Sequence, residues 1–295
     1  MPANVIASDA GPSRSAWPAK WRIGPILLVG PLVAYMLVFY ALPLAAMLLR
    51  SIDDPAWTLE NYQRLTGDTV FLIVFWTTLR TALVVTAGTL LFGYPVALAM
   101  SRLPRRAAGV VLIIVLLPFW TSVLVRSYAW MVLLGRKGLI NEALIATGLT
   151  DTPLKLLNTP FAVHIAMIHI LLPYMILPIA SVLRQMDAAL PRAAAGLGAT
   201  PWSVFVRIIL PLSMPGVAAG VLLVFVLSLG FYITPALVGG PRDFMLSMLI
   251  AQQVDLLNWP YAACLSATLL AVTMVMIALF QRLPGVRDVL RAVTR

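Results

Sequence analysis

The most informative stretch of this sequence is DAALPRAAAGLGATPWSVFVRIILP, residues 187–211. Its first half is rich in helix-forming residues, with Ala193, Ala194, Ala195 and Leu197 close together. Gly198 follows them and is well placed to end a helix, because glycine readily adopts the left-handed conformation of a C-terminal cap. The first half therefore predicts a short helix that stops at a tight turn.

The second half of this stretch predicts another helix. Thr200 suits the N-cap position, where its hydroxyl can accept a bond from an unpaired N–H, and Pro201 suits the first helical position. Four apolar positions would continue the helix, namely Trp202, Phe205, Ile208 and Ile209. Two short helices with small side chains suit close contact with another protein. The rigid turn between them could then pass a movement of that protein into the membrane span that follows. The alternative is a re-entrant helical hairpin that fills the middle of a bundle.

The rest of the sequence has the composition of a membrane protein. The 295 residues are 61% hydrophobic and 11% charged, with a mean hydropathy of +0.95, well outside the balance of a water-soluble domain. Six stretches lack Asp, Glu, Lys and Arg and are long enough to cross about 30 Å of hydrocarbon as helix. They are residues 23–49, 81–100, 107–125, 161–183, 213–238 and 256–281. We expect an all-α membrane protein with six transmembrane helices.

The segments outside the spans are short. Residues 1–22, rich in Pro, Ala and Ser, are expected to be a disordered cytoplasmic tail, and residues 284–295 a second cytoplasmic tail. Residues 23–283 would form one transmembrane domain. Its first span is longer than the apolar core of a signal peptide, about 7–15 residues, and no small-residue cleavage site follows, so we expect it to stay as an anchor.

The basic residues predict the orientation. With both termini inside, the inner segments hold thirteen basic residues: Arg14, Lys20, Arg22, Arg102, Arg105, Arg106, Arg184, Arg192, Arg207, Arg282, Arg287, Arg291 and Arg295. The outer segments hold eight: Arg50, Arg64, Arg80, Arg126, Arg136, Lys137, Lys155 and Arg242. The excess of Lys and Arg marks the cytoplasmic face. The chain is thus expected to be a multi-pass protein of the bacterial inner membrane with both termini in the cytoplasm.

Several function classes are disfavoured. The net charge of +10 is divided among short segments beside apolar spans, which argues against nucleic-acid binding. Cys264 is the single cysteine, so an internal disulfide and a cysteine metal site are excluded. No G-x-x-x-x-G-K-[ST], H-E-x-x-H or G-x-S-x-G motif is present. We expect no enzyme activity, no cofactor and no metal in this chain.

Candidate residues for a solute pathway are mainly aromatic. No carboxylate lies inside a predicted span, and only His164 and His169 are ionisable there, on different faces of one helix. An ion-coupled carrier usually keeps an ionisable group near the bilayer centre, so this pattern disfavours one. We select Trp120, Tyr128, Trp130, Tyr232 and Asp255, with Tyr232, expected inside the fifth span, as the first choice. For each, ordinary packing or interface anchoring is the competing explanation.

At residues 192–211 the chain resembles a known family. Ala193, Ala194, Gly198, Ile208, Leu210 and Pro211 match the spacing of the EAA loop, Glu-Ala-Ala followed by Gly and Ile-x-Leu-Pro, of permease subunits of ATP-binding cassette (ABC) importers. The resemblance implies the type I importer (MetI-like) fold and a coupling loop over 187–211. Its contact residues would be Arg192, Ala193, Ala194, Leu197, Gly198, Ala199, Thr200, Pro201, Ile208, Leu210 and Pro211. Arg192 stands where the motif has Glu.

Other segments, among them residues 118–130, 138–141, 157–159, 169–173 and 233–240, resemble permeases of the spermidine/putrescine type. This resemblance implies a polyamine as the solute. It also implies a separate ATPase subunit that holds ATP and Mg²⁺, a second and different permease subunit, and an extracytoplasmic solute-binding protein. The alternatives are an ABC permease for another small organic solute, an ion-coupled secondary transporter, and a membrane scaffold that only recruits a partner.

Overall fold

The computed structural model describes residues 23–53 and 57–282. The predicted tails at 1–22 and 284–295 lie outside these residues. The chain divides into two units, one up to Leu49 and one from Arg50 onward, and each is considered by itself.

The first unit is one apolar helical run. It consists of α1 (Ile23–Met36), a π-helical turn η2 (Leu37–Ala41) and the greater part of α2 (Leu42–Asp53). The π turn is closed by a hydrogen bond from Leu42 N to Leu37 O. It stands directly before Pro43, whose nitrogen has no hydrogen to donate to the carbonyl of Phe39. The chain thus stays helical where proline would interrupt the regular ladder.

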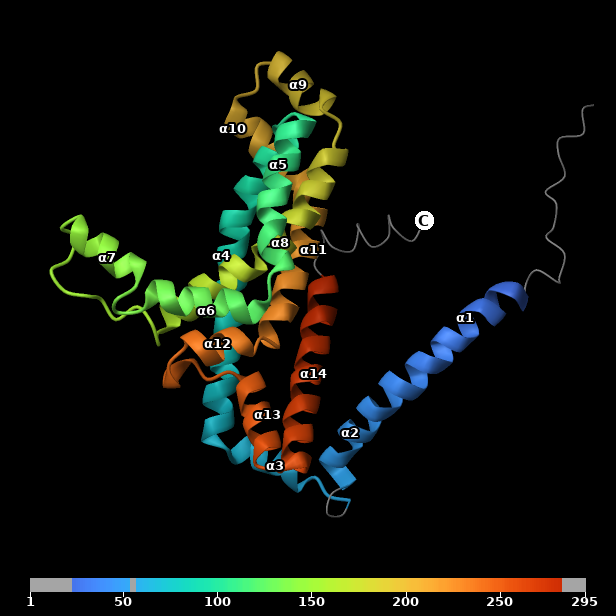
Figure 1. Cartoon of the computed structure of the whole chain (residues 1–295). Helices are drawn as coiled ribbons and strands as arrows, with labels where there is room; N and C mark the ends of the chain where they lie inside the picture. The colour runs from blue at the N-terminus through green and yellow to red at the C-terminus, as the bar shows by residue number, and fades with distance from the viewer. Residues whose placement is uncertain (1–22, 54–56, 283–295) are drawn as a thin grey trace, which may run out of the picture. The chain divides into compact units, whose positions relative to one another are not determined.

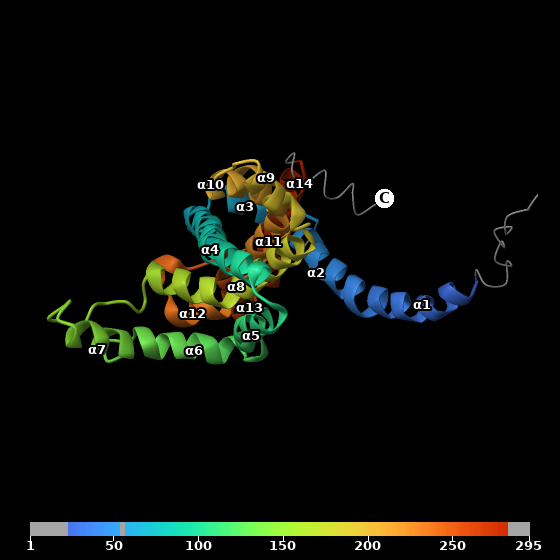
Figure 2. The same cartoon turned by 90° about the horizontal axis from the view of Figure 1, so that it is seen from above.

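The second unit is a helical bundle built on three long helices (Figures 1 and 2). These are α4 (Thr69–Arg102), α8 (Pro160–Gln185) and α11 (Leu210–Leu229), which contact one another along their lengths. Around them lie α3 (Glu60–Gly67), α5 (Arg105–Leu116), η3 (Leu117–Trp120), α6 (Val123–Leu134), α7 (Leu139–Ala146), α9 (Ala189–Gly196), α10 (Pro201–Val204), η4 (Phe205–Ile209), α12 (Ile233–Val238), η5 (Pro241–Asp243), α13 (Leu246–Asp255) and α14 (Trp259–Gln281).

Small residues let α8 and α11 approach closely. A Cβ atom at Gly216 would lie 2.7 Å from the carbonyl oxygen of Pro178, and one at Gly220 would lie 2.8 Å from the sulfur of Met175. Met175 and Ile176 are fully buried in the same core. Because lipid is as apolar as these side chains, such close van der Waals contact is what holds membrane helices together.

The N-terminal end of α4 is tied to α14. Asp68 caps α4 by accepting a hydrogen bond from Val70 N at 2.9 Å, and its other oxygen accepts one from the Tyr261 hydroxyl at 2.9 Å. The guanidinium of Arg64 lies over the Tyr261 ring, 4.7 Å from its centre. Partial burial favours the protonated form of Asp68, but the hydrogen bonds from Tyr261, Val70 and Phe71, together with Arg64, hold its pKa below the ordinary value.

The predicted six-span, all-helical architecture is confirmed. Within the described residues, five helices are long and apolar enough to cross a membrane, and a sixth span is formed by a bent pair, Arg105–Trp120 and Val123–Ala146. The residue bounds differ from the prediction in several spans, and the one predicted at 81–100 already begins at Thr69. The stretch 107–125 turns by 96° instead of running straight, and 213–238 stops at Leu229, after which α12 is a separate helix. The segments 50–80 and 126–160, which lie between predicted spans, are also largely helical, in α3, α4, α6 and α7.

Candidate functional sites: the 187–211 loop and the junction of two broken helices

The first helix of the loop, α9, begins earlier than predicted. Asp187 starts it, because its Oδ1 accepts a hydrogen bond from Ala189 N at 2.8 Å. The helix then runs Ala189–Gly196, so that Arg192 lies in its middle rather than at its start. The sequence prediction rested on the alanines from Ala193 onward and gave no weight to this aspartate.

The turn after α9 has the predicted geometry. Gly198 has φ +85°, its N–H donates to Ala195 O at 3.0 Å, and Ala199 N donates to Ala194 O at 3.0 Å. These two bonds are those of a Schellman cap, with the glycine in the left-handed position. Thr200 then caps the next helix, since its hydroxyl accepts from Ser203 N at 3.3 Å. The predicted roles of Gly198 and Thr200 in the backbone are therefore confirmed.

The second helix of the loop continues directly into a span. Helices α10, η4 and α11 form one apolar run, Pro201–Leu229, without a loop between them. The π turn η4 stands before Pro211, in the same relation as η2 to Pro43. Phe205 in this turn packs edge-on against Tyr94 of α4, with ring centres 5.9 Å apart, and the Tyr94 hydroxyl is 2.9 Å from Ser213 Oγ. The loop is thus coupled rigidly to α11 and α4.

The tip of the loop presents apolar side chains to its surroundings. Leu197 is 90% exposed and Trp202 is 72% exposed. Both belong to a segment at one end of the bundle, beyond the ends of α4 and α8 (Figure 1). Large apolar side chains at such exposure on a rigid element are typical of a protein contact surface.

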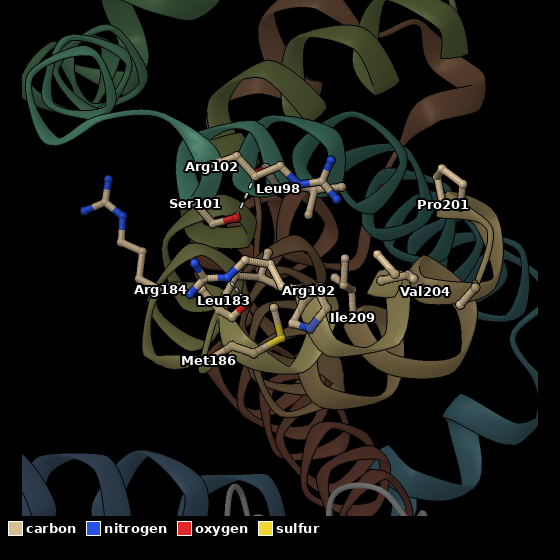
Figure 3. A pocket seen from close by; sticks show the side chains of 14 residues that line it. Leu98, Ser101, Arg102, Leu183, Arg184, Met186, Arg192, Pro201, Val204 and Ile209 are labelled. Atoms are coloured by element: carbon tan, nitrogen blue, oxygen red, sulfur yellow. Dashed lines mark hydrogen bonds between the residues drawn. The ribbon is translucent and has the colours of Figure 1, made fainter. Parts of the chain in front are cut away.

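A pocket of about 630 Å³ lies between the loop and the ends of α4 and α8 (Figure 3). Its lining is apolar with three arginines: Leu98, Ser101, Arg102, Leu183, Arg184, Met186, Ala188, Pro191, Arg192, Ala195, Ala199, Pro201, Val204 and Ile209. The Arg184 side chain extends away from the others, whereas Arg192 is held against its own helix by a bond from Nε to Ala188 O at 3.0 Å. The loop surface at Arg192 is therefore basic where the family motif is acidic.

The second candidate site is a junction between two interrupted helices near the middle of the bundle. One interruption is the 96° bend at Thr121 and Ser122, and the other is the break between Leu229 and Ile233. Ser127 of α6 and Thr234 of α12 join the two, with their oxygens 2.7 Å apart and both side chains fully buried. Interrupted helices within a membrane are tolerated where the backbone is enclosed by protein or lines a cavity.

The structure places four of the five predicted pathway residues on the elements that form the junction, namely η3, α6 and the N-cap of α12. Trp120 and Tyr128 flank the bend and are 85% and 54% exposed. Tyr232 is the N-cap residue of α12 and is 46% exposed, so its predicted place inside the fifth span is wrong, because α11 ends at Leu229. Trp130 is engaged in packing, since its Nε1 donates to His169 Nδ1 at 3.3 Å. Asp255 is the last residue of α13 and lies outside the junction.

Arg126 belongs to this junction, although the sequence analysis assigned it to an outer segment. It lies on α6, next to Ser127, and interacts electrostatically with His169 and Tyr174 of α8. Pro118 and the Thr121-Ser122 pair, a possible helix start after a proline, were the local signals for a bend that keeps Arg126 within the bundle. A buried guanidinium nitrogen without a partner is costly, so such a residue is seldom without a role.

The sequence of this chain matches a known family of membrane proteins. Residues 89–283 match the family described as the binding-protein-dependent transport system inner membrane component, and this match covers more than half of the chain. The chain belongs to this family. It is a permease component of an ABC importer, as the 187–211 loop predicts, and an inner-membrane protein.

Curated relatives agree with this assignment. The permease is 35% identical over 265 residues to the spermidine/putrescine transport system permease protein PotB of Salmonella typhimurium (strain SL1344), a match covering 87% of this chain and 92% of the relative. It is 32% identical over 305 residues to the inner membrane ABC transporter permease protein YdcU of Escherichia coli (strain K12), covering 95% and 96%.

Among solved structures, the permease is similar to a chain of a bacterial alginate ABC transporter in complex with an alginate pentasaccharide-bound periplasmic protein. The TM-score is 0.69 at 20% identity, and the match covers 89% of this permease and 94% of that chain. At this identity the likeness concerns the fold, and it confirms the predicted type I importer architecture.

Proposed function

We propose that this permease imports a polyamine such as putrescine or spermidine, together with a second and different permease subunit, and that its 187–211 loop docks onto a separate ATPase subunit. The observation that carries the docking is the unbroken helix Pro201–Leu229, which begins at an exposed apolar tip and ends at the mid-membrane junction. A push on Leu197 or Trp202 would therefore reach the break before α12 without an intervening flexible segment.

Two observations support the remaining parts. The likeness to PotB over most of the chain favours a polyamine, and the exposed aromatic residues Trp120, Tyr128 and Tyr232 offer ring faces to a cationic solute. The chain carries no phosphate-binding loop in its sequence, so ATP and Mg²⁺ would be held by the ATPase subunit. An extracytoplasmic binding protein would deliver the solute, since the alginate transporter of similar fold is in complex with a periplasmic protein.

Transport in a defined system tests this function. The permease is co-purified with its ATPase, second permease and binding-protein partners, and reconstituted in proteoliposomes with ATP on the loop side. We expect ATP-dependent uptake of labelled putrescine or spermidine. Uptake driven by an ion gradient without ATP would instead establish a secondary transporter. ATP-dependent uptake of a different solute would refute the polyamine assignment alone.

The orientation in the membrane can be tested by labelling introduced cysteines, because the single native cysteine is buried. Cys264 is fully buried, so a cysteine introduced at an exposed position is the accessible thiol for a membrane-impermeant maleimide. Leu197→Cys should be labelled in inside-out vesicles and protected in right-side-out cells. The matched control is Trp57→Cys, at a position 75% exposed on the predicted outer side, with the opposite pattern expected. Labelling of both positions from one side would refute the proposed topology.

A further inference from the structure

Arg126 is a charged residue that the proposed function leaves without a role. It lies on α6, and its electrostatic neighbours His169 and Tyr174 stand on either side of the midpoint of α8. Because α8 is long enough to cross the hydrocarbon layer, its midpoint lies near the bilayer centre. Arg126 is thus an intramembrane cation.

The described part of the chain supplies no counter-charge for this cation. Arg126 Nε is buried without a hydrogen-bond partner, while the residue as a whole is half-buried. The helices that pack on α6 are α7, α8 and α12, and the acid among them is Glu142 of α7, in the segment after α6 has ended. It forms no ion pair with Arg126.

The surface beside Arg126 is also uncovered by this chain. Leu124, Tyr128 and Val132 recur at helical spacing along α6 and are 50%, 54% and 67% exposed. Trp120 at the bend is more exposed still. An apolar stripe of this kind beside a cation that needs a partner fits a neighbouring membrane protein that covers the stripe and neutralises the charge.

We propose that Arg126 forms an intramembrane ion pair with an Asp or Glu of the second permease subunit, at the surface that α6 presents. This inference rests on the proposed function, in that it assumes a second permease. A second copy of this chain fits poorly, because the candidate spans among the described residues carry carboxylates only near their ends, at Asp53 and Glu142. The subunit opposite α6 is therefore a different chain with an acid in its spans.

An ion pair at Arg126 would also remove the charge repulsion between this junction and a cationic solute. A free guanidinium beside the exposed aromatic residues would repel a polyamine at the place where cation–π contacts are offered. Once Arg126 is neutralised by a carboxylate, the aromatic faces can act without that repulsion. The acid thus serves both subunit pairing and passage of the solute.

A charge exchange in the assembled transporter tests the pair. Arg126→Glu should lower co-purification of the second permease and solute uptake by about tenfold or more, because two carboxylates would then face each other in a low-dielectric site. Replacing one particular intramembrane acid of the second permease by Arg should restore both. Arg136→Glu is the matched control, since Arg136 is an exposed arginine just after α6, and it should change neither.

The outcomes are distinct. If no acid in the spans of the second permease restores the Arg126→Glu variant, or if that variant assembles and transports normally, the ion pair is refuted. Normal assembly with selective loss of uptake of an anion such as succinate would make Arg126 a solute-binding residue instead, which also overturns the proposal. A wild-type permease that binds no ATPase subunit would contradict the proposed function, which this exchange does not measure.

Discussion

Replacement of Gly198 tests whether the turn of the loop carries the coupling. Its φ of +85° is a left-handed conformation, and no atom lies within 4 Å of a Cβ built there, so a larger side chain meets no obstacle. The cost is confined to the backbone and amounts to about 1–2 kcal/mol for an ordinary L-residue. If docking requires this turn, the competent population should fall roughly five- to thirtyfold.

The Gly198 variants should differ in ATPase affinity in a fixed order. We expect ATPase affinity to decrease from Gly198 through Gly198→Asn and Gly198→Ala to Gly198→Val, because Asn tolerates the left-handed region best and a β-branched residue least. Gly196→Ala is the matched control. Gly196 also has open space around its Cβ but belongs to α9, where alanine favours the helix by about 0.5–1 kcal/mol.

The assay is the affinity of the purified permease complex for its ATPase subunit, followed by ATP-dependent uptake at matched protein levels. Gly196→Ala should match or exceed the wild type in both. Equal affinity of Gly198→Val and wild type would refute the coupling role of the turn. Equal losses in the Gly196 and Gly198 variants would show that the segment responds to any added volume, and the backbone argument would fail.

Three further outcomes are expected. Leu197→Ala should weaken ATPase binding by about tenfold or more. Its melting temperature should not change, because the side chain is 90% exposed. The control Leu91→Ala removes a 69% exposed leucine of α4 and should leave ATPase binding intact. Ser127→Ala and Thr234→Val should each lower stability, and their double-mutant cycle should give a coupling of about 0.5–2 kcal/mol by thermal unfolding; additive effects would contradict the 2.7 Å bond. The hydrogen bonds that hold the pKa of Asp68 below its ordinary value of 3.8 stabilise the fold above that pH, and this stability is lost as pH falls through the lower folded-state pKa. The free energy of unfolding should therefore depend less on pH in Asp68→Asn than in the wild type between about pH 6 and pH 3. An unchanged pH dependence would refute this.

The local backbone of the loop could be predicted from the sequence because its determinants are short-range. A glycine cap, a threonine N-cap and a proline at the first helical position act on neighbouring residues, and the structure has Gly198, Thr200 and Pro201 in these positions. The number and type of spans followed from hydropathy for a similar reason, since each is a long uncharged run.

The junction could not be predicted in the same way. Both sides of the bend at Ser122 and of the break after Leu229 are apolar, so the hydropathy pattern continues smoothly across each interruption. The bend also places Arg126 on a helix packed against α8, whereas a charge near the end of an apolar run is ordinarily taken as the border of the span. Tertiary contacts such as Ser127 with Thr234 decide these positions.

The continuity of Pro201–Leu229 gives the helix the mechanics of a lever. At 1.5 Å per residue its 29 residues span about 43 Å, so a tilt of roughly 5° about one end moves the other by about 4 Å. The far end is Leu229, where the backbone breaks before α12, whose Thr234 is hydrogen-bonded to Ser127 of α6. A small tilt that leaves the fold of the loop unchanged is thereby amplified into a displacement of the helix end that is large enough to move an aromatic side chain at the junction.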